Sequence, residues 1–205
     1  MFDPHLILRS LAERRPIFHS EADFQHEFAW ELRSHFPECQ IRLEVPSTGE
    51  GVGATDIVMR HGGAVHGIEL KYLTRRHESE VQGEAFSLKA HGAQDLRRYD
   101  VLKDVWRLER FNGLYGGPSL VIALTNDRSY WRPYQRRATI DAAFRLDEGR
   151  IVSGELRWAE QAGAGTIKGR AAPLDLSGRH HMAWRDYAGA SDSGGRFRYL
   201  AIEIH

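Results

Sequence analysis

The chain has 205 residues, of which 41% are hydrophobic and 27% are charged, and its 28 basic residues balance 28 acidic ones. These values are typical of one folded domain, or of one domain with an appendage, and they exclude a disordered chain. No run approaches the ~18 consecutive apolar residues of a membrane-spanning helix, and the N-terminal segment lacks the basic flank and apolar centre of a signal peptide. The single cysteine, Cys39, excludes a disulfide framework. We therefore expect a cytoplasmic protein without a membrane partner.

The basic residues are unevenly divided between arginine and lysine. There are 24 arginines and only four lysines, which are Lys71, Lys89, Lys103 and Lys168. Coding bias in a GC-rich genome accounts for such an excess, and each lysine then marks a position worth inspecting. Net neutrality argues against a basic surface along the whole chain, but it allows a local basic groove.

The predicted elements alternate between helices and strands. In chain order we expect a helix over residues 20–36, strands over residues 40–46, 56–60 and 64–73, a helix over residues 89–111 and a buried strand over residues 119–127. The first helix has clear ends, because Ser20 can cap its first turn and Pro37 stops it. A glycine-rich loop over residues 47–55 precedes the strands 56–60 and 64–73, which the turn at residues 61–63 joins into a hairpin.

After residue 137 the sequence is rich in glycine and contains three strand-like segments, over residues 138–146, 150–158 and 196–205. We therefore expect an α/β fold, with a mixed central sheet flanked by helices, in residues 1–137. A β-rich extension over residues 138–205 follows, which can belong to the same domain and complete the same sheet.

The most informative candidate site consists of Asp56, Glu69 and Lys71. Glu69 and Lys71 are two residues apart on one strand and therefore point to the same face, and the hairpin turn brings Asp56 opposite them. The two carboxylates, with the main-chain carbonyl of Leu70, are ligands suited to Mg²⁺ or Mn²⁺. A lysine beside them can position or deprotonate an attacking water and offset charge on a phosphate. The alternative is a solvated strand face on which Glu69 and Lys71 form an ion pair in water.

Both predicted helices carry polar groups on their apolar faces. Glu21 lies on the stripe that runs from Phe24 to Phe36, where a carboxylate is costly unless it is paired or bound to a cation; a role in capping the helix N-terminus is the alternative. Near the start of the second helix, Gln94 and Arg98 lie on the same face as the apolar residues of its C-terminal half. The Arg98 guanidinium is suited to binding a phosphate. The alternative is that this end of the helix is solvated.

Arginines alternate with aromatic residues in the segment 128–137. This composition is typical of a nucleic-acid contact, because arginines bind phosphates and aromatic rings stack on unpaired bases. With two arginines just past Lys71, the candidates are Arg75, Arg76, Arg128, Tyr130, Trp131, Arg132, Arg136 and Arg137. The alternative is a surface loop whose aromatic rings pack onto the core.

Taken together, the elements and charged residues over residues 18–130 resemble the PD-(D/E)XK nuclease superfamily, which has the restriction-endonuclease-like fold. The matching residues are the helix glutamate, the hairpin acid, the Glu-x-Lys pair and the glutamine of the next helix, which are Glu21, Asp56, Glu69, Lys71 and Gln94. The resemblance implies a Mg²⁺-dependent nuclease that accepts Mn²⁺ as a substitute, with DNA favoured over RNA as its substrate. It implies that Asp56 and Glu69 are metal ligands, that Lys71 is the catalytic lysine, and that Glu21 and Gln94 complete the site.

Two other functions are compatible with the same residues. A nucleic-acid-binding or scaffold protein could keep this fold without turnover, although an idle site has no reason to keep buried charges. A small-molecule metal hydrolase is the third interpretation, and the segment 128–137 favours a polymeric substrate instead. Both a monomer and a homodimer fit the sequence.

Overall fold

The computed structural model describes residues 3–46, 53–133, 139–189 and 195–205. The helices are α1 (Pro4–Arg14), α2 (Glu21–His35), α3 (Gln94–Tyr115) and the short 3₁₀ helix η1 (Ala142–Phe144). The strands are β1 (Gln40–Pro46), β2 (Ala54–His61), β3 (Ala64–Leu73), β4 (His77–Val81), β5 (Glu84–Leu88), β6 (Ser119–Thr125), β7 (Ile151–Leu156), β8 (Leu174–His181), β9 (Trp184–Ala188) and β10 (Phe197–Ile204).

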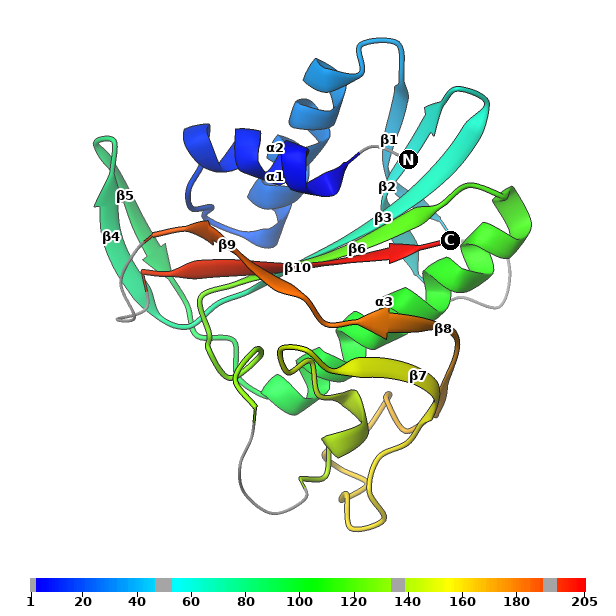
Figure 1. The fold of residues 1–205 in the computed structure, drawn as a ribbon. Helices are drawn as coiled ribbons and strands as arrows, with labels where there is room; N and C mark the ends of the chain where they lie inside the picture. Colours follow the sequence, from blue (N-terminus) through cyan, green and yellow to red (C-terminus); the bar gives the residue numbers. More distant parts are fainter. Residues whose placement is uncertain (1–2, 47–52, 134–138, 190–194) are drawn as a thin grey trace.

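A mixed sheet of six strands, in the order β1-β2-β3-β6-β10-β9, forms the centre of this α/β protein (Figure 1). Strands β1, β2 and β3 pair antiparallel, β3 and β6 pair parallel, and β10 pairs antiparallel with both β6 and β9. The parallel pair needs a crossover connection, which α3 provides. The helices α1 and α2 cover one face of the sheet and α3 covers the other, so that two hydrophobic clusters lie on opposite faces.

The elements with a clear sequence pattern form as expected. Helix α2 begins after Ser20, whose hydroxyl accepts a hydrogen bond from the Asp23 N–H. Strands β1 and β3 have the predicted bounds, and β2 extends beyond the predicted residues 56–60. Strand β6 is buried at all seven positions, as the continuous apolar run predicts. None of the helices that the structure describes is long and apolar enough to cross a membrane.

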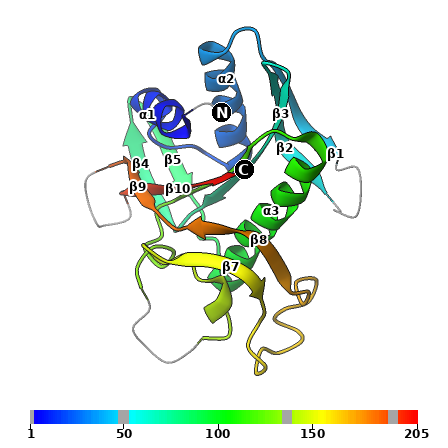
Figure 2. The same ribbon diagram turned by 45° about the vertical axis from the view of Figure 1, so that its right-hand side comes forward.

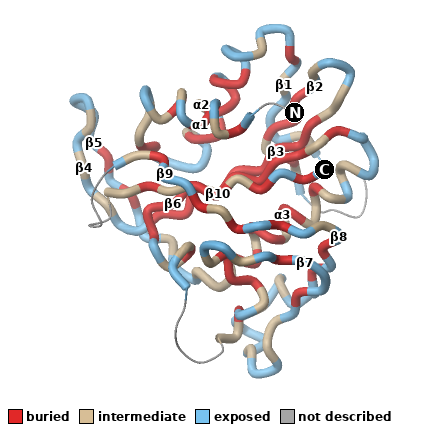
Figure 3. Tube along the Cα trace, in the orientation of Figure 1, coloured by how far each residue is buried: buried red, intermediate tan, exposed pale blue. Residues whose placement is uncertain are grey.

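Strand β3 is buried on both of its faces (Figure 3). Ile68, Leu70 and Tyr72 pack with α1 and α2, whereas the opposite face, which carries Glu69 and Lys71, meets α3. Gly67 allows a close approach there, since a Cβ atom at this position would lie 2.7 Å from Leu108 Cδ2 of α3. The charged residues of β3 are therefore pressed between the sheet and a helix.

Several elements are absent from the sequence prediction. Helix α1 was not expected, although Asp3 caps it and Pro4 occupies its first turn. The hairpin β4–β5 was not expected either, because its many exposed polar side chains show no clear strand pattern. The strand expected over residues 138–146 is wrong for its described part, residues 139–146, where the regular structure is the 3₁₀ helix η1.

The C-terminal region contributes to two layers. Strands β9 and β10 complete the central sheet, whereas β7 and β8 form a separate antiparallel pair. Figure 2 shows this pair on the far side of α3, which therefore lies between two β layers. Glu109 of α3 fastens β8 by accepting hydrogen bonds from the Ser177 and Gly178 N–H groups and by contacting His180 at 2.9 Å.

Candidate active site

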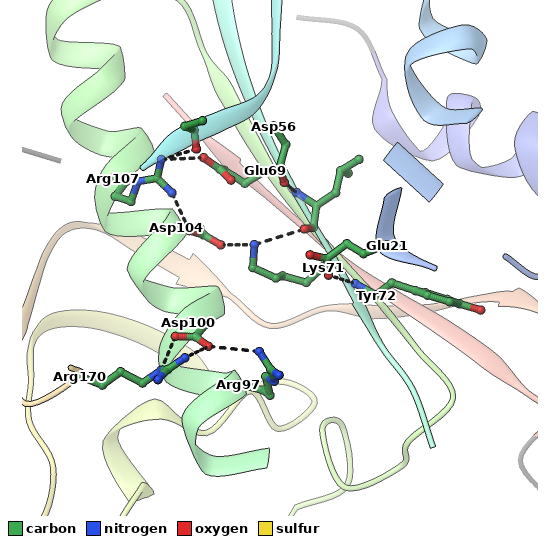
Figure 4. Close-up of polar contacts among 12 residues, drawn as sticks. Glu21, Asp56, Glu69, Lys71, Tyr72, Arg97, Asp100, Asp104, Arg107 and Arg170 are labelled. Atoms are coloured by element: carbon green, nitrogen blue, oxygen red, sulfur yellow. Dashed lines mark hydrogen bonds and ion pairs between the residues drawn. The ribbon is translucent and has the colours of Figure 1, made fainter. Parts of the chain in front are cut away.

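Asp56, Glu69 and Lys71 converge where β2 and β3 meet α3 (Figure 4). Asp56 Oδ2 accepts a hydrogen bond of 2.7 Å from the Leu70 N–H, and Lys71 Nζ donates to the Leu70 carbonyl at 3.3 Å. Glu69 is only 1% exposed. The interpretation of this strand face as solvated is therefore wrong, because α3 covers it.

Helix α3 adds two charged residues that the sequence analysis does not identify, Asp104 and Arg107. Asp104 Oδ2 lies 2.8 Å from Lys71 Nζ. Arg107 lies 3.3 Å from Glu69 Oε1 and 3.1 Å from Asp104 Oδ1, and it donates a hydrogen bond of 2.6 Å to the Ala54 carbonyl. A signal for Asp104 is present in the sequence, since this carboxylate stands on the inward apolar face of α3.

Glu21 reaches the same region from the start of α2. Its carboxylate accepts a hydrogen bond of 2.8 Å from the N–H of Tyr72, the residue after Lys71. Glu21 is exposed rather than turned to the core, contrary to expectation, because its carboxylate reaches the main chain of β3 beyond the stretch that pairs with β2. The helix N-terminus is capped by Ser20, so the Glu21 carboxylate serves the strand backbone instead.

These six residues, Glu21, Asp56, Glu69, Lys71, Asp104 and Arg107, are called the charged cluster below. Burial, followed by the carboxylates of Asp104 and Asp56, raises the pKa of Glu69 to about 9. Burial also raises the pKa of Asp56, against the opposing effect of Lys71. Burial alone would lower the pKa of Lys71, but the carboxylates around it, led by Asp104, raise it above its ordinary value. Four carboxyl groups thus meet two cations, and the raised pKa of Glu69 shows that the cluster without a metal ion disfavours ionising all of them.

The donor set of the charged cluster fits a hard divalent cation only in part. Among the residues that the structure describes, no group of three His, Cys, Asp or Glu side chains could hold a metal ion. Asp56, Glu69 and the Leu70 carbonyl are all oxygen donors, and Mg²⁺ is often held by one or two carboxylates together with water and substrate phosphate. Glu69 Oε1 is buried and accepts no hydrogen bond within the described chain, although it faces Arg107. These oxygen donors therefore fit a divalent cation whose remaining coordination positions are filled by water and by a substrate phosphate.

The start of α3 lies outside the charged cluster, which corrects the prediction for Gln94 and Arg98. Gln94 Nε2 contacts Asp127 Oδ2 at 3.3 Å and lies ten residues before Asp104, or about 15 Å along the helix. Arg98 is buried and is paired with Asp141 at 2.6 Å. It therefore cannot meet a phosphate, and it is not solvated either, because the C-terminal region covers this turn of α3.

The two aromatic residues of segment 128–137 that the structure describes, Tyr130 and Trp131, pack against the hydrophobic core. Tyr130 is 1% exposed, and Arg98 lies 5.3 Å from its ring centroid. The Trp131 ring lies 5.9 Å from that of Trp184. The expectation of base stacking is therefore wrong for Tyr130, whereas the half-exposed Trp131 leaves it a prediction.

The arginines predicted to contact nucleic acid have different surroundings. The exposed ones are Arg75, Arg76, Arg128 and Arg132. The Arg75 N–H donates a hydrogen bond of 2.7 Å to Asn126 Oδ1. This contact places Arg75 beside segment 128–137, as expected. Arg136 and Arg137 lie outside the described residues, as do residues 47–52 of the glycine-rich loop.

A cleft of about 460 Å³ opens beside the charged cluster. Glu21 and Lys71 belong to its lining, so the cleft reaches the charged cluster at these two residues. Its other walls come from the loop before α2 and from the segment that joins β5 to α3. A substrate group that enters this cleft would reach Lys71.

No protein-family model, no curated protein and no solved structure matches this chain. The function is therefore inferred from the chemistry of the site.

Proposed function

We propose that this protein is a metal-dependent nuclease that hydrolyses phosphodiester bonds, with DNA favoured over RNA as the sequence resemblance implies. The observation that carries the proposal is the charged cluster, in which four carboxyl groups meet two cations next to an open cleft. Burial and the neighbouring carboxylates raise the pKa of Glu69, because ionising all of these acids is costly unless a further cation balances their charge. A divalent cation and a phosphate that enters from the cleft would together balance the charges.

The residues of the cluster have separable roles in this proposal. Asp56, Glu69 and the Leu70 carbonyl would hold Mg²⁺, with Mn²⁺ as a substitute. The bound ion polarises a phosphoryl oxygen and lowers the pKa of a bound water. Lys71, whose raised pKa keeps it protonated, is suited to orient a water and to stabilise negative charge on the phosphate, but not to remove a proton. Asp104 is a positioning residue, because it holds Lys71 Nζ at 2.8 Å.

The order of elements also supports the proposal. Helix α2, strands β1, β2 and β3, helix α3 and strand β6 follow one another with only the hairpin β4–β5 inserted. This is the order that the resemblance to PD-(D/E)XK nucleases implies. The acid of β2 and the Glu-x-Lys pair of β3 stand at the expected positions of that order.

A non-catalytic nucleic-acid-binding or scaffold protein is the second candidate, and one observation favours it. Glu69 is paired with Arg107, and Asp104 with Lys71, so part of the charge is compensated inside the protein. In that case Arg107 would balance the charge of Glu69, as the metal ion would in the nuclease. Metal binding separates the two functions.

The first experiment is a calorimetric titration of Mn²⁺ into the wild type and into Asp56→Asn and Glu69→Gln. Asparagine keeps an oxygen acceptor for the Leu70 N–H, and glutamine keeps the shape of Glu69. Glu109→Gln is the matched control, since Glu109 is a carboxylate of α3 that is bound to β8 and not to the cluster. We expect binding in the wild type and the control, and loss of binding in the two cluster variants.

The second experiment measures Mg²⁺-dependent cleavage of single-stranded DNA, duplex DNA and RNA. Lys71→Met should lower the cleavage rate by at least about 100-fold, because it removes a cation that stabilises charge in the transition state. The Mn²⁺ titration is repeated with a phosphorothioate oligonucleotide present, so that a site completed by the substrate is also detected. Absence of metal binding in both titrations would refute the nuclease and favour the non-catalytic candidate.

A further inference from the structure

The cleft beside the charged cluster lies between three segments that are distant in sequence. His19 and Glu21 line it from the start of α2, and Lys71 and Thr74 line it from the end of β3. Lys89, which stands between β5 and α3, lies on the facing wall. His19 Nε2 contacts Glu84 at 2.8 Å and its ring stacks on Phe86, so the hairpin β4–β5 closes one side of the cleft.

The wall that carries Lys89 and His91 is fixed by one buried residue, Thr74. The Thr74 hydroxyl donates a hydrogen bond of 2.7 Å to the Lys89 carbonyl, and the His91 N–H donates to the Thr74 carbonyl at 2.7 Å. The Thr74 N–H donates to His91 Nδ1 at 3.2 Å, which leaves the proton of the neutral ring on Nε2. The wall is therefore ordered before any ligand arrives, which lowers the entropic cost of binding.

The lining of the cleft carries more cations than carboxylates. Among the described residues, Lys71, Lys89 and Arg97 line it together with one carboxylate, that of Glu21, and Lys71 is already paired with Asp104. Arg97 lies 3.8 Å from Asp100, but Asp100 is already bound by two nitrogens of Arg170, at 2.6 and 2.9 Å (Figure 4). Asp100 therefore leaves Arg97 with charge to offer to another anion. Two of the four lysines of the chain line this one cleft.

The size and the surroundings of the cleft favour one strand over two. A volume of about 460 Å³ is within the range of pockets that hold a single small ligand, so the cleft suits one nucleotide. The hairpin beside it contains Glu80 and Glu84, and a third glutamate, Glu78, is paired with Arg76 at 2.8 Å. A duplex carries one charge per about 1.7 Å of its axis, against about 3.4 Å for one strand, so the glutamates on this side of the cleft disfavour a duplex more than a single strand.

From these observations we infer that the cleft binds a phosphate of single-stranded nucleic acid, with Lys89 and Arg97 as the phosphate-binding residues and the His91 Nε2–H as a further donor. The substrate is then a single strand or an unpaired end rather than an intact duplex. This inference rests on the proposed function and specifies its substrate.

The test is the binding of a short fluorescein-labelled DNA strand and of the duplex of the same sequence, measured by fluorescence anisotropy in EDTA. The double variant Lys89→Ala/Arg97→Ala should bind the single strand about tenfold more weakly, and the salt dependence of log K should become shallower by about 1.4, because each neutralised phosphate of a single strand contributes about 0.7. Lys168→Ala/Arg179→Ala is the matched control, because both residues are exposed and outside the cleft. We expect the control to bind like the wild type.

Each outcome bears on the inference. Equal affinity of the wild type for the single strand and the duplex would overturn the single-strand preference, and equal affinity of the double variant and the wild type would overturn the assignment of the cleft. Thermal unfolding of each variant shows whether it is folded, and Thr74→Ser, which keeps the hydroxyl, should bind like the wild type. The anisotropy assay in EDTA measures strand binding without a metal ion. If the protein binds the single strand there but binds no Mn²⁺ in the calorimetric titrations, only the proposed nuclease function is refuted. Cleavage that the double variant leaves unchanged would refute only the inference.

Discussion

Replacing Glu69 with glutamine should remove a pH dependence of stability that the metal-free wild type shows. The buried carboxyl has its pKa raised to about 9 by burial and by Asp104 and Asp56, from an ordinary value of 4.5. Between these two values the folded protein binds a proton that the unfolded chain has released. The stabilisation is therefore complete below the unfolded pKa and is lost as the pH rises through the folded pKa.

The proton that Glu69 holds only in the folded protein determines how steeply the free energy of unfolding changes with pH. In this window each pH unit lowers the free energy of unfolding by about 1.4 kcal/mol, so a rise from about pH 7 to about pH 8.5 lowers it by about 2 kcal/mol. For a slope of about 2 kcal/mol per molar urea, the unfolding midpoint falls by about 1 M.

Urea unfolding in EDTA, followed by tryptophan fluorescence at the two pH values, measures this difference. Glu109→Gln is the control. Although Glu109 is partly buried, hydrogen bonds from His180, Ser177 and Gly178 lower its pKa, so it is ionised in both states across this window. The wild type and the control should lose about 1 M in midpoint, and Glu69→Gln should lose little. Equal losses in the wild type and Glu69→Gln would refute the assignment of a buried, protonated Glu69.

Three further predictions concern residues around α3. Asp104→Asn should slow cleavage by about 10–100-fold and move the alkaline limb of the pH–rate profile to lower pH, since Asp104 is the main charge that raises the pKa of Lys71; an unchanged profile would exclude the positioning role. Asp141→Asn should lower the free energy of unfolding by about 3–5 kcal/mol in denaturant titrations, because it leaves Arg98 buried without its partner. Gly67→Ala should cost about 1–3 kcal/mol in the same assay, because the new methyl group would meet a leucine of α3 at 2.7 Å.

Local pattern accounts for the part of the fold and site that the sequence predicts. The cap at Ser20 defines the start of α2, and the apolar run of β6 marks a strand buried on both faces. The period of two along β3 places Glu69 and Lys71 on one face, and the hairpin turn brings Asp56 to them. These relations depend only on neighbours in the chain, and a sequence displays them directly. The short, half-exposed strands β4 and β5 have no such pattern, and they were missed.

Only the tertiary structure determines which groups meet β3 from other parts of the chain. The position of α3 along the sheet brings Asp104 and Arg107 to the charged cluster and leaves Gln94 about 15 Å away along the helix axis. The sequence shows that α3 has an apolar face, but how far a helix slides along a sheet depends on packing between distant residues, such as the contact at Gly67. The covering of Arg98 by the C-terminal region depends on distant packing in the same way. The sequence therefore identifies the acids and the lysine of β2 and β3, and long-range packing selects their partners.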